Sequence, residues 1–211
     1  MVQDQVRQDI AFIRNAIEEG GSYAAACSPD LMVWGTAVAL GYLGTFAFIR
    51  GWLSLTPNWI WAICLGLPWL YSLRRVPARV SGRAAASIRG PMARAMSMLW
   101  LGCGVFLTTL ALAVLWSNEA QDGWFGAVAA GVLGIAFFVS AWLSNLGWLR
   151  GVAVAWWIGE FAAYGLRHRA EALPLLAALM LILLAGPGAV LMARQARMRR
   201  ARAGQAEALR G

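Results

Sequence analysis

Four polar side chains in the C-terminal third of the sequence have the types and the spacing to do chemistry together. Glu160, Tyr164 and His168 recur at every fourth position, and Arg167 lies beside them. On an α-helix this spacing places side chains on a common side. Because the flanking residues are apolar, the carboxyl group must be protonated, paired or in contact with a wet cavity. These four residues form a candidate intramembrane polar site for a proton or cation.

A structural role for Glu160 is the alternative. The residue lies roughly 10 Å from the end of its apolar segment, at 1.5 Å per residue, which is shallow enough to reach an arginine at the boundary. Arg167 and Arg50 are the candidate partners. An ion pair is the simpler of the two explanations, and both stay open at this stage.

Elsewhere the residue types do not form a catalytic or metal-binding pattern. The chain has one histidine, His168, and three cysteines, Cys27, Cys64 and Cys103, without a CxxC pair. It contains no GxSxG, HExxH or Walker motif and no acidic cluster that would hold a metal. We therefore expect no catalytic residue, no metal and no cofactor, and we predict that the protein is not an enzyme.

The elements that must position these residues are apolar blocks. Of the chain's residues, 60% are hydrophobic and 13% are charged, and the mean hydropathy is +0.60. Soluble domains carry roughly 25% charged residues. A helix needs about 20 apolar residues to cross a bilayer. Six blocks fit, at about 31–49, 54–73, 95–116, 124–143, 148–166 and 172–193. The predicted fold class is all-α, a polytopic bundle of six transmembrane helices.

Two of the six blocks carry a weaker signal. Block 54–73 contains Asn58 and Pro68, and block 148–166 contains Arg150 and Glu160. We nevertheless count both as spans, because the distribution of arginines requires an even number.

The arginines predict the orientation. All 18 basic residues are arginine, and twelve of them gather in two blocks. The first block is Arg74, Arg75, Arg79, Arg83, Arg89 and Arg94, and the second is Arg194, Arg197, Arg199, Arg200, Arg202 and Arg210. Short loops rich in arginine stay cytoplasmic. Six spans place both blocks and both termini on the cytoplasmic side of the membrane. The net charge of +8 then reflects topology and contact with anionic lipid, and we do not expect a nucleic acid partner.

Residues 1–30 are predicted to form a cytoplasmic amphipathic helix and a linker. Val6, Ile10, Ile13 and Ile17 recur at helical spacing on one face. The polar face is mixed in charge rather than basic, so attraction to anionic lipid does not recruit it. Docking on the protein's own cytoplasmic loops is one role for this helix, and binding a partner protein is the other.

The same segment carries a resemblance. The run from Asp9 to Arg14, DIAFIR, followed by Glu18, Glu19 and Gly20 and then by the first span, is similar to the start of a loose group of small proteobacterial multi-pass membrane proteins. Those proteins share a D-[LI]-A-F-[LI]-R…EEG segment. The resemblance covers about the first 45 residues. It implies a bacterial inner-membrane location, and the group has no established activity and contributes no catalytic residues.

A stripe of small residues runs along the fifth block. Gly147, Gly151, Ala155, Gly159 and Ala163 recur every fourth residue. Small residues let helices approach closely in a membrane, where lipid provides no hydrophobic drive for association. The stripe predicts helix packing within the bundle, and the alternative is a seam between two copies of the chain.

Two functions are consistent with these features. The first is a non-enzymatic subunit or regulator, with the helix 1–30, a transmembrane domain 31–193 and a basic tail 194–211, which engages a cytoplasmic or membrane protein partner through its helix and arginine-rich loop. The second is a small proton- or cation-coupled carrier or channel centred on Glu160. Pro68 and the triplet Gly186-Pro187-Gly188 interrupt two spans, as helices in carriers often do.

Overall fold

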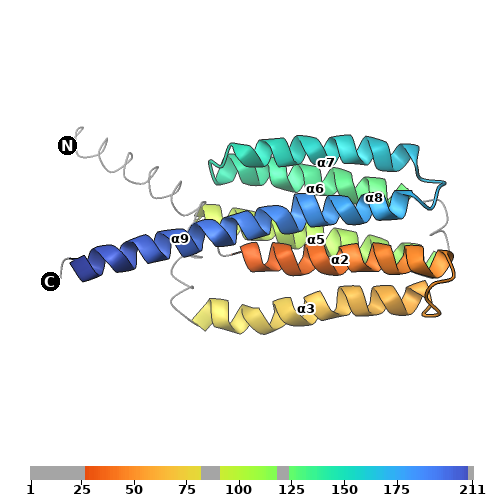
Figure 1. The fold of residues 1–211 in the computed structure, drawn as a ribbon, viewed down its shortest axis with the longest axis horizontal. Helices are drawn as coiled ribbons and strands as arrows, with labels where there is room; N and C mark the ends of the chain where they lie inside the picture. The colour runs from red at the N-terminus through yellow and green to blue at the C-terminus, as the bar shows by residue number, and fades with distance from the viewer. Residues whose placement is uncertain (1–26, 82–90, 118–123, 209–211) are drawn as a thin grey trace.

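The computed structural model describes residues 27–81, 91–117 and 124–208, and all regular structure in these ranges is helical. The helices are α2 (Ser28–Ile49), α3 (Pro57–Ser81), α5 (Pro91–Ser117), α6 (Trp124–Leu143), α7 (Trp148–Gly165) and a last long helix made of α8 (Ala172–Leu179), the π-helical segment η2 (Met180–Ala185) and α9 (Gly186–Ala208). They lie side by side and alternate in direction along the chain (Figure 1). The all-α prediction is confirmed for the described residues.

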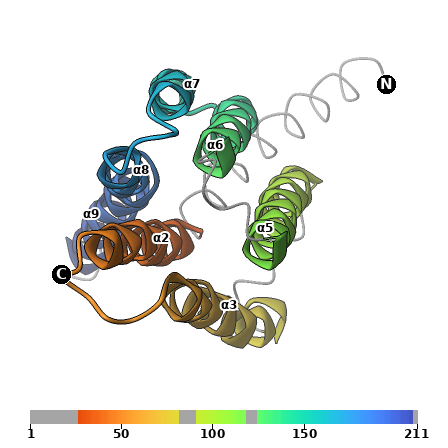
Figure 2. The same ribbon diagram turned by 90° about the vertical axis from the view of Figure 1, so that its right-hand side faces the viewer.

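The helices form a ring when the bundle is viewed along its axis (Figure 2). α6 packs most closely on α7, and α2 packs on α3 and along α8, η2 and α9, while α5 packs on α6. α3 and α5 are neighbours in the ring but are not among the closely packed pairs. One wall of the bundle is therefore looser than the others.

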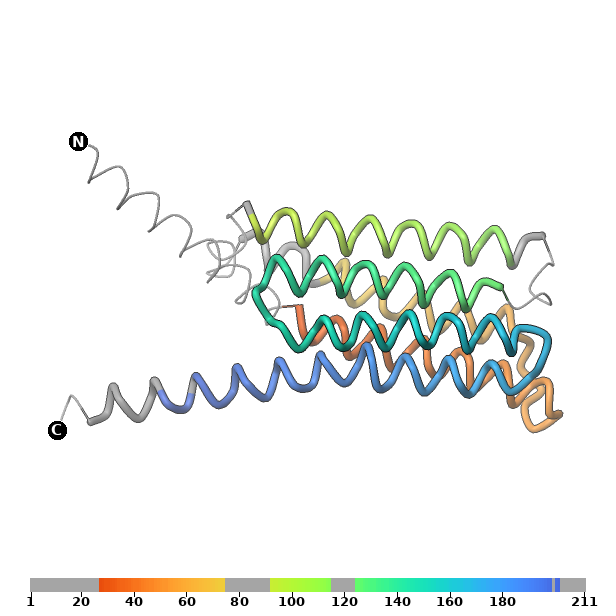
Figure 3. Tube along the Cα trace, turned by 90° about the horizontal axis from the view of Figure 1, so that it is seen from above, coloured from red at the N-terminus to blue at the C-terminus, as the bar shows by residue number. Residues whose placement is uncertain are grey.

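The last helix is longer than the bundle. Figure 3 shows α9 continuing beyond the end of the bundle at which α2 begins. α9 therefore includes the basic segment from Arg194 as far as Ala208. The helix continues without a break through the boundary that we predicted between span and tail at residues 193 and 194. The predicted helix 1–30 lies outside the described residues, except that α2 already begins at Ser28.

Each of the six predicted spans falls on a helix, but only part of the six-span prediction is met. Among the described residues, four helices are long and apolar enough to cross a membrane: Ser28–Ile49, Met92–Val114, Trp124–Leu143 and Ala172–Met198. α3 falls short because it contains Asn58 and continues into arginines from Arg74 onward. α7 is long enough, but it falls short in hydropathy because it includes Arg150 and Glu160. The described residues are consistent with a helical membrane protein in which four helices are long and apolar enough to cross a bilayer.

Glycines allow the first and last helices to touch. A Cβ on Gly35 would lie 2.7 Å from the backbone nitrogen of Ala185, and one on Gly188 would lie 2.7 Å from the carbonyl oxygen of Ser28. Atoms cannot approach so closely, so any larger residue at either position would push α2 away from the last helix. This contact is the type of small-residue packing that membrane helices use.

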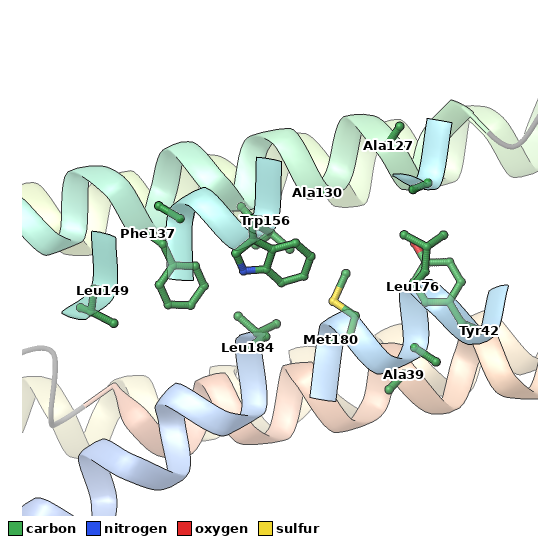
Figure 4. Packing of buried hydrophobic residues seen from close by; sticks show 14 of the residues in the cluster. Ala39, Tyr42, Ala127, Ala130, Phe137, Leu149, Trp156, Leu176, Met180 and Leu184 are labelled. Atoms are coloured by element: carbon green, nitrogen blue, oxygen red, sulfur yellow. The ribbon is translucent and has the colours of Figure 1, made fainter. Parts of the chain in front are cut away.

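Pro187 removes a backbone hydrogen bond from the π-helical segment. Pro187 has no N–H, so the carbonyl of Leu183 lacks its α-helical donor. The indole N–H of Trp156 donates to this carbonyl at 3.3 Å. Trp156 is fully buried between α6 and the last helix, where it lies beside Leu184 and Met180 (Figure 4). A side chain of α7 therefore replaces the hydrogen bond that the proline removes.

This replacement predicts a specific coupling between Trp156 and Pro187. Trp156→Phe should lower the melting temperature of the detergent-solubilised protein, since an unsatisfied buried carbonyl costs about 1–3 kcal/mol. Adding Pro187→Ala should recover part of that loss, because an alanine N–H can bond to Leu183. Thermal unfolding of both single variants and the double variant measures the coupling.

Trp157→Phe is the matched control, because Trp157 is partly exposed and its indole has no hydrogen bond among the described residues. If the losses at Trp156 and Pro187 simply added, the carbonyl would not depend on the indole.

Candidate functional site

A cavity of about 1200 Å³ lies inside the ring of helices. Residues of α2, α3, α5, α6 and the last helix line it. On α2 the lining residues recur every three or four positions, as Leu31, Trp34, Val38, Tyr42 and Thr45 do. One face of α2 therefore borders the cavity for most of its length. Pockets for small molecules usually measure roughly 300–1,000 Å³, so this space is large.

Tryptophan indoles bridge consecutive helices around the cavity. Each indole N–H donates to a hydroxyl group of the next helix, and all six side chains line the cavity. The pairs are Trp34 with Ser72 at 3.2 Å, Trp69 with Thr108 at 3.2 Å and Trp100 with Ser140 at 3.0 Å. These bonds join α2 to α3, α3 to α5 and α5 to α6. Each hydroxyl oxygen is thereby engaged by an indole, so the wall presents mainly rings and methyl groups.

Aromatic contacts hold these rings in place. Trp34 and Trp69 meet edge to face with ring centroids 5.6 Å apart, and Trp100 meets Phe137 in the same way at 5.3 Å. Edge-to-face pairs at this separation are favourable beyond the area that they bury. The aromatic wall is consequently rigid, because each ring is fixed by a hydrogen bond and by a neighbouring ring.

The two ends of the cavity differ in charge. Arg167, His168 and Arg169, in the connection between α7 and α8, line one end. Asp30, in the first turn of α2, lies at the opposite end. The cavity therefore has a basic end where α7 and α8 meet.

The predicted polar site is divided by the structure. Arg167 and His168 line the cavity, but Glu160 and Tyr164 do not. Arg167 turns back on its own helix: its guanidinium lies 4.2 Å from the centre of the Tyr164 ring, and Nη1 donates to the Tyr164 carbonyl oxygen at 3.1 Å. The four residues do not form one site, because α7 ends at Gly165 and the helical spacing of Glu160 and Tyr164 does not continue to Arg167 and His168 in the connection to α8.

Glu160 does not have the partner proposed for it. Its carboxyl group lies over Gly131 of α6, where an added Cβ would be 2.9 Å from both carboxyl oxygens. Arg50 instead pairs with Glu171 at 3.7 Å. Within the described part of the chain, Glu160 makes no hydrogen bond or ion pair. The predicted pair with Arg167 or Arg50 is therefore absent.

The small-residue stripe of α7 does not form one packing face. Gly159 and Ala163 are buried, and a Cβ on Gly159 would meet Leu179 of α8 at 2.7 Å. Ala155 is half-buried. Gly147 and Gly151 are exposed, and an added Cβ would meet nothing within 4 Å at either. Only the half of the stripe toward α8 packs within the bundle, because α7 has a close neighbour on this side only there.

The sequence did contain a signal for the cavity. The three indole–hydroxyl pairs are separated by 38, 39 and 40 residues, which is the length of one helical hairpin in this chain. Each of these tryptophans lies near one end of its predicted span and is followed by Ser or Thr about one hairpin later, a spacing that indicates bridges between successive helices.

Comparison with known proteins adds no assignment: no protein-family model, no curated protein and no solved structure matches this chain. In the part that the structure describes, no group of three or more His, Cys, Asp or Glu side chains is arranged to hold a metal ion. Within the described residues, the features that suggest a function are the cavity and the basic residues at the two ends of the bundle.

The position of Glu160 predicts that Glu160→Gln leaves the melting temperature in detergent unchanged or raises it. Glutamine keeps the shape of the side chain and removes a carboxyl group that has no partner among the described residues. Glu171→Gln is the control, since it removes an exposed ion pair worth about 0–1 kcal/mol. A larger loss of stability for Glu160→Gln than for Glu171→Gln would contradict this placement.

Proposed function

We propose that this chain is a six-span bacterial inner-membrane protein that acts as a non-enzymatic subunit or regulator. Both termini lie in the cytoplasm, and the cytoplasmic end of the bundle binds an acidic surface of a partner protein. The proposal depends on one observation above all, the projection of α9 beyond the bundle (Figure 3).

The projecting part of α9 is basic and has no cover within the chain's described residues. Arg194, Arg197 and Arg200 are exposed, and so are most of the residues between them. A single helix that is polar on all sides is marginal in water by itself. Contact with an acidic partner would stabilise it and would satisfy its charge.

A partner protein fits the projection better than lipid head groups do. Residues 194–208 rise roughly 20 Å along the helix, whereas exposed charges at physiological salt are screened over about 8 Å. Only the first turns of this segment can therefore feel the membrane surface. Near that surface Arg194 is fixed, with its guanidinium 5.7 Å from the ring centre of Trp148.

The arrangement of the helices supports six spans. α3 and α7 lie alongside the clear spans over a similar length of the bundle (Figure 1). α3 ends and α5 begins at the end from which α9 projects, so the two arginine blocks flank the same end of the bundle. This is the distribution that the positive-inside rule associates with the cytoplasm.

A carrier or channel centred on Glu160 is the second candidate. Its support is the carboxyl group of Glu160, which has no partner among the described residues. Two observations argue against it. Glu160 does not line the cavity. Ser72, Thr108 and Ser140 do line it, but each of their hydroxyl oxygens already accepts a hydrogen bond from an indole. A path for a hydrated cation would need polar groups that are free to replace water.

The topology predicts opposite results for two reporter fusions. Alkaline phosphatase inserted after Gln121 should be active, because three spans precede this loop and three follow it, which places it in the periplasm when both termini are cytoplasmic. A fluorescent protein at the C-terminus should fluoresce, because this end stays in the cytoplasm. An inactive phosphatase at Gln121 together with a fluorescent C-terminus would mean that the six-span topology is wrong.

The partner proposal predicts charge-dependent capture from native membranes. The tagged full chain should retain a stoichiometric partner that is released by high salt. The triple variant Arg194→Gln, Arg197→Gln, Arg200→Gln should lower its capture by roughly tenfold, since exposed ion pairs are worth up to about 1 kcal/mol each. Quantitative mass spectrometry measures the ratio.

The matched control introduces three glutamines at exposed positions of the same segment without removing charge: Ala193→Gln, Ala196→Gln and Met198→Gln. Equal capture by the charge variant and by this control, or no stoichiometric partner, would overturn the proposal.

A further inference from the structure

The cavity is long enough to hold an extended chain. On α2 its lining runs from Leu31 to Ile49, which corresponds to roughly 27 Å at 1.5 Å per residue. The hydrocarbon core of a bilayer is about 30 Å thick. A long, narrow ligand that lies parallel to the helices fits this shape better than a compact solute does.

The wall suits hydrocarbon rather than a hydrated ion. Trp34, Trp69 and Trp100 present their rings, and their N–H groups are already bonded to hydroxyls of neighbouring helices. Leu133, Leu176 and Met180 complete the opposite side. An acyl chain needs no hydrogen bond, so it can occupy this space without disturbing the bridges.

The cavity opens sideways toward lipid between α3 and α5. Leu73 on α3, and Met98 and Leu101 on α5, line the cavity, yet they are 60%, 66% and 52% exposed. These two helices are not among the closely packed pairs. Among the described residues, the hydrogen bond from Trp69 to Thr108 links these two helices. A lipid chain can therefore enter from the bilayer without passing through water.

The charge at one end selects the head group. Arg167, His168 and Arg169 line the end formed by the α7–α8 connection. Glu171, two residues after Arg169, is engaged by Arg50 at 3.7 Å. Asp30, the acid among the described lining residues, belongs to the opposite end of α2. Among the described residues that line the cavity, a phosphate at the α7–α8 end would therefore meet arginines and no acid.

From this combination we infer that the cavity binds one anionic phospholipid of the bilayer. An acyl chain lies along the tryptophan wall, and the phosphate is held at Arg167 and Arg169. This site is separate from the basic α9 segment, so it does not depend on the proposed partner, and either proposal can fail without the other.

A cavity-filling substitution tests the chain site, and α5 offers a matched control. Gly104 lines the cavity and Gly102 does not, and an added Cβ would meet nothing within 4 Å at either position. Gly104→Leu should fill the path of the chain, whereas Gly102→Leu adds the same side chain to the outer face of the same helix.

Native mass spectrometry of the full chain in neutral detergent provides the measurement. The protein is titrated with dioleoyl phosphatidylglycerol and, separately, with dioleoyl phosphatidylcholine. The wild-type protein and Gly102→Leu should retain one phosphatidylglycerol, with roughly tenfold weaker retention of phosphatidylcholine. Gly104→Leu should lose retention of both lipids. Arg167→Gln with Arg169→Gln should abolish the preference, since each arginine near an anionic head group contributes roughly a fivefold change.

Three results would overturn the inference. Equal lipid retention by Gly104→Leu and Gly102→Leu would show that the chain lies outside the cavity. An undiminished preference for phosphatidylglycerol in the double arginine variant would show that the head group binds elsewhere. Displacement of phosphatidylglycerol by equimolar oleate would show that the site takes a free fatty acid instead of a phospholipid.

Discussion

The need to pair every buried polar group in an apolar interior shapes this bundle more than any other constraint. Where lipid surrounds a protein, no water is present to form a hydrogen bond with an unpaired N–H or carbonyl group. At four carbonyl or hydroxyl groups this chain meets the requirement with tryptophan, although the buried indole N–H of Trp148 has no hydrogen-bond partner among the described residues. The indole of Trp156 supplies the hydrogen bond that Pro187 removes from Leu183, and three further indoles pair with hydroxyls across neighbouring helices. Because each bond joins two helices, satisfying a polar group also fixes the spacing between them.

The bundle is denser on one side than on the other. α2 touches the last helix through Gly35 and Gly188, where no side chain intervenes. α3 and α5 are not among the closely packed pairs, and Trp69 reaches across to Thr108 between them. Trp69 and Thr108 both line the cavity, which therefore borders this looser wall.

Charge is divided between the two ends of the molecule. At the end where α2 begins, arginines on α9 project beyond the bundle, and Arg150 lies 4.2 Å from the ring centre of Trp142. At the opposite end, Arg167 and Arg169 border the cavity, and Arg50 pairs with Glu171. One basic surface thus faces outward beyond the bundle and the other borders the cavity. We propose different ligands for them, a protein at the first and a lipid at the second.

Composition and periodicity were enough to predict an all-helical membrane protein and the positions of its apolar helices, because burial in lipid demands long apolar segments that can be read locally. They did not predict which polar residues meet. The spacing of Glu160 and His168 predicted a shared helix face, yet α7 ends at Gly165, so Glu160 lies on Gly131 while Arg167 and His168 border the cavity from the following connection. Gly151 and Gly159 belong to one stripe, yet only Gly159 has a neighbour. What stands opposite a residue depends on contacts between segments far apart in the chain, such as Trp100 with Ser140, and only the folded arrangement of the helices decides it.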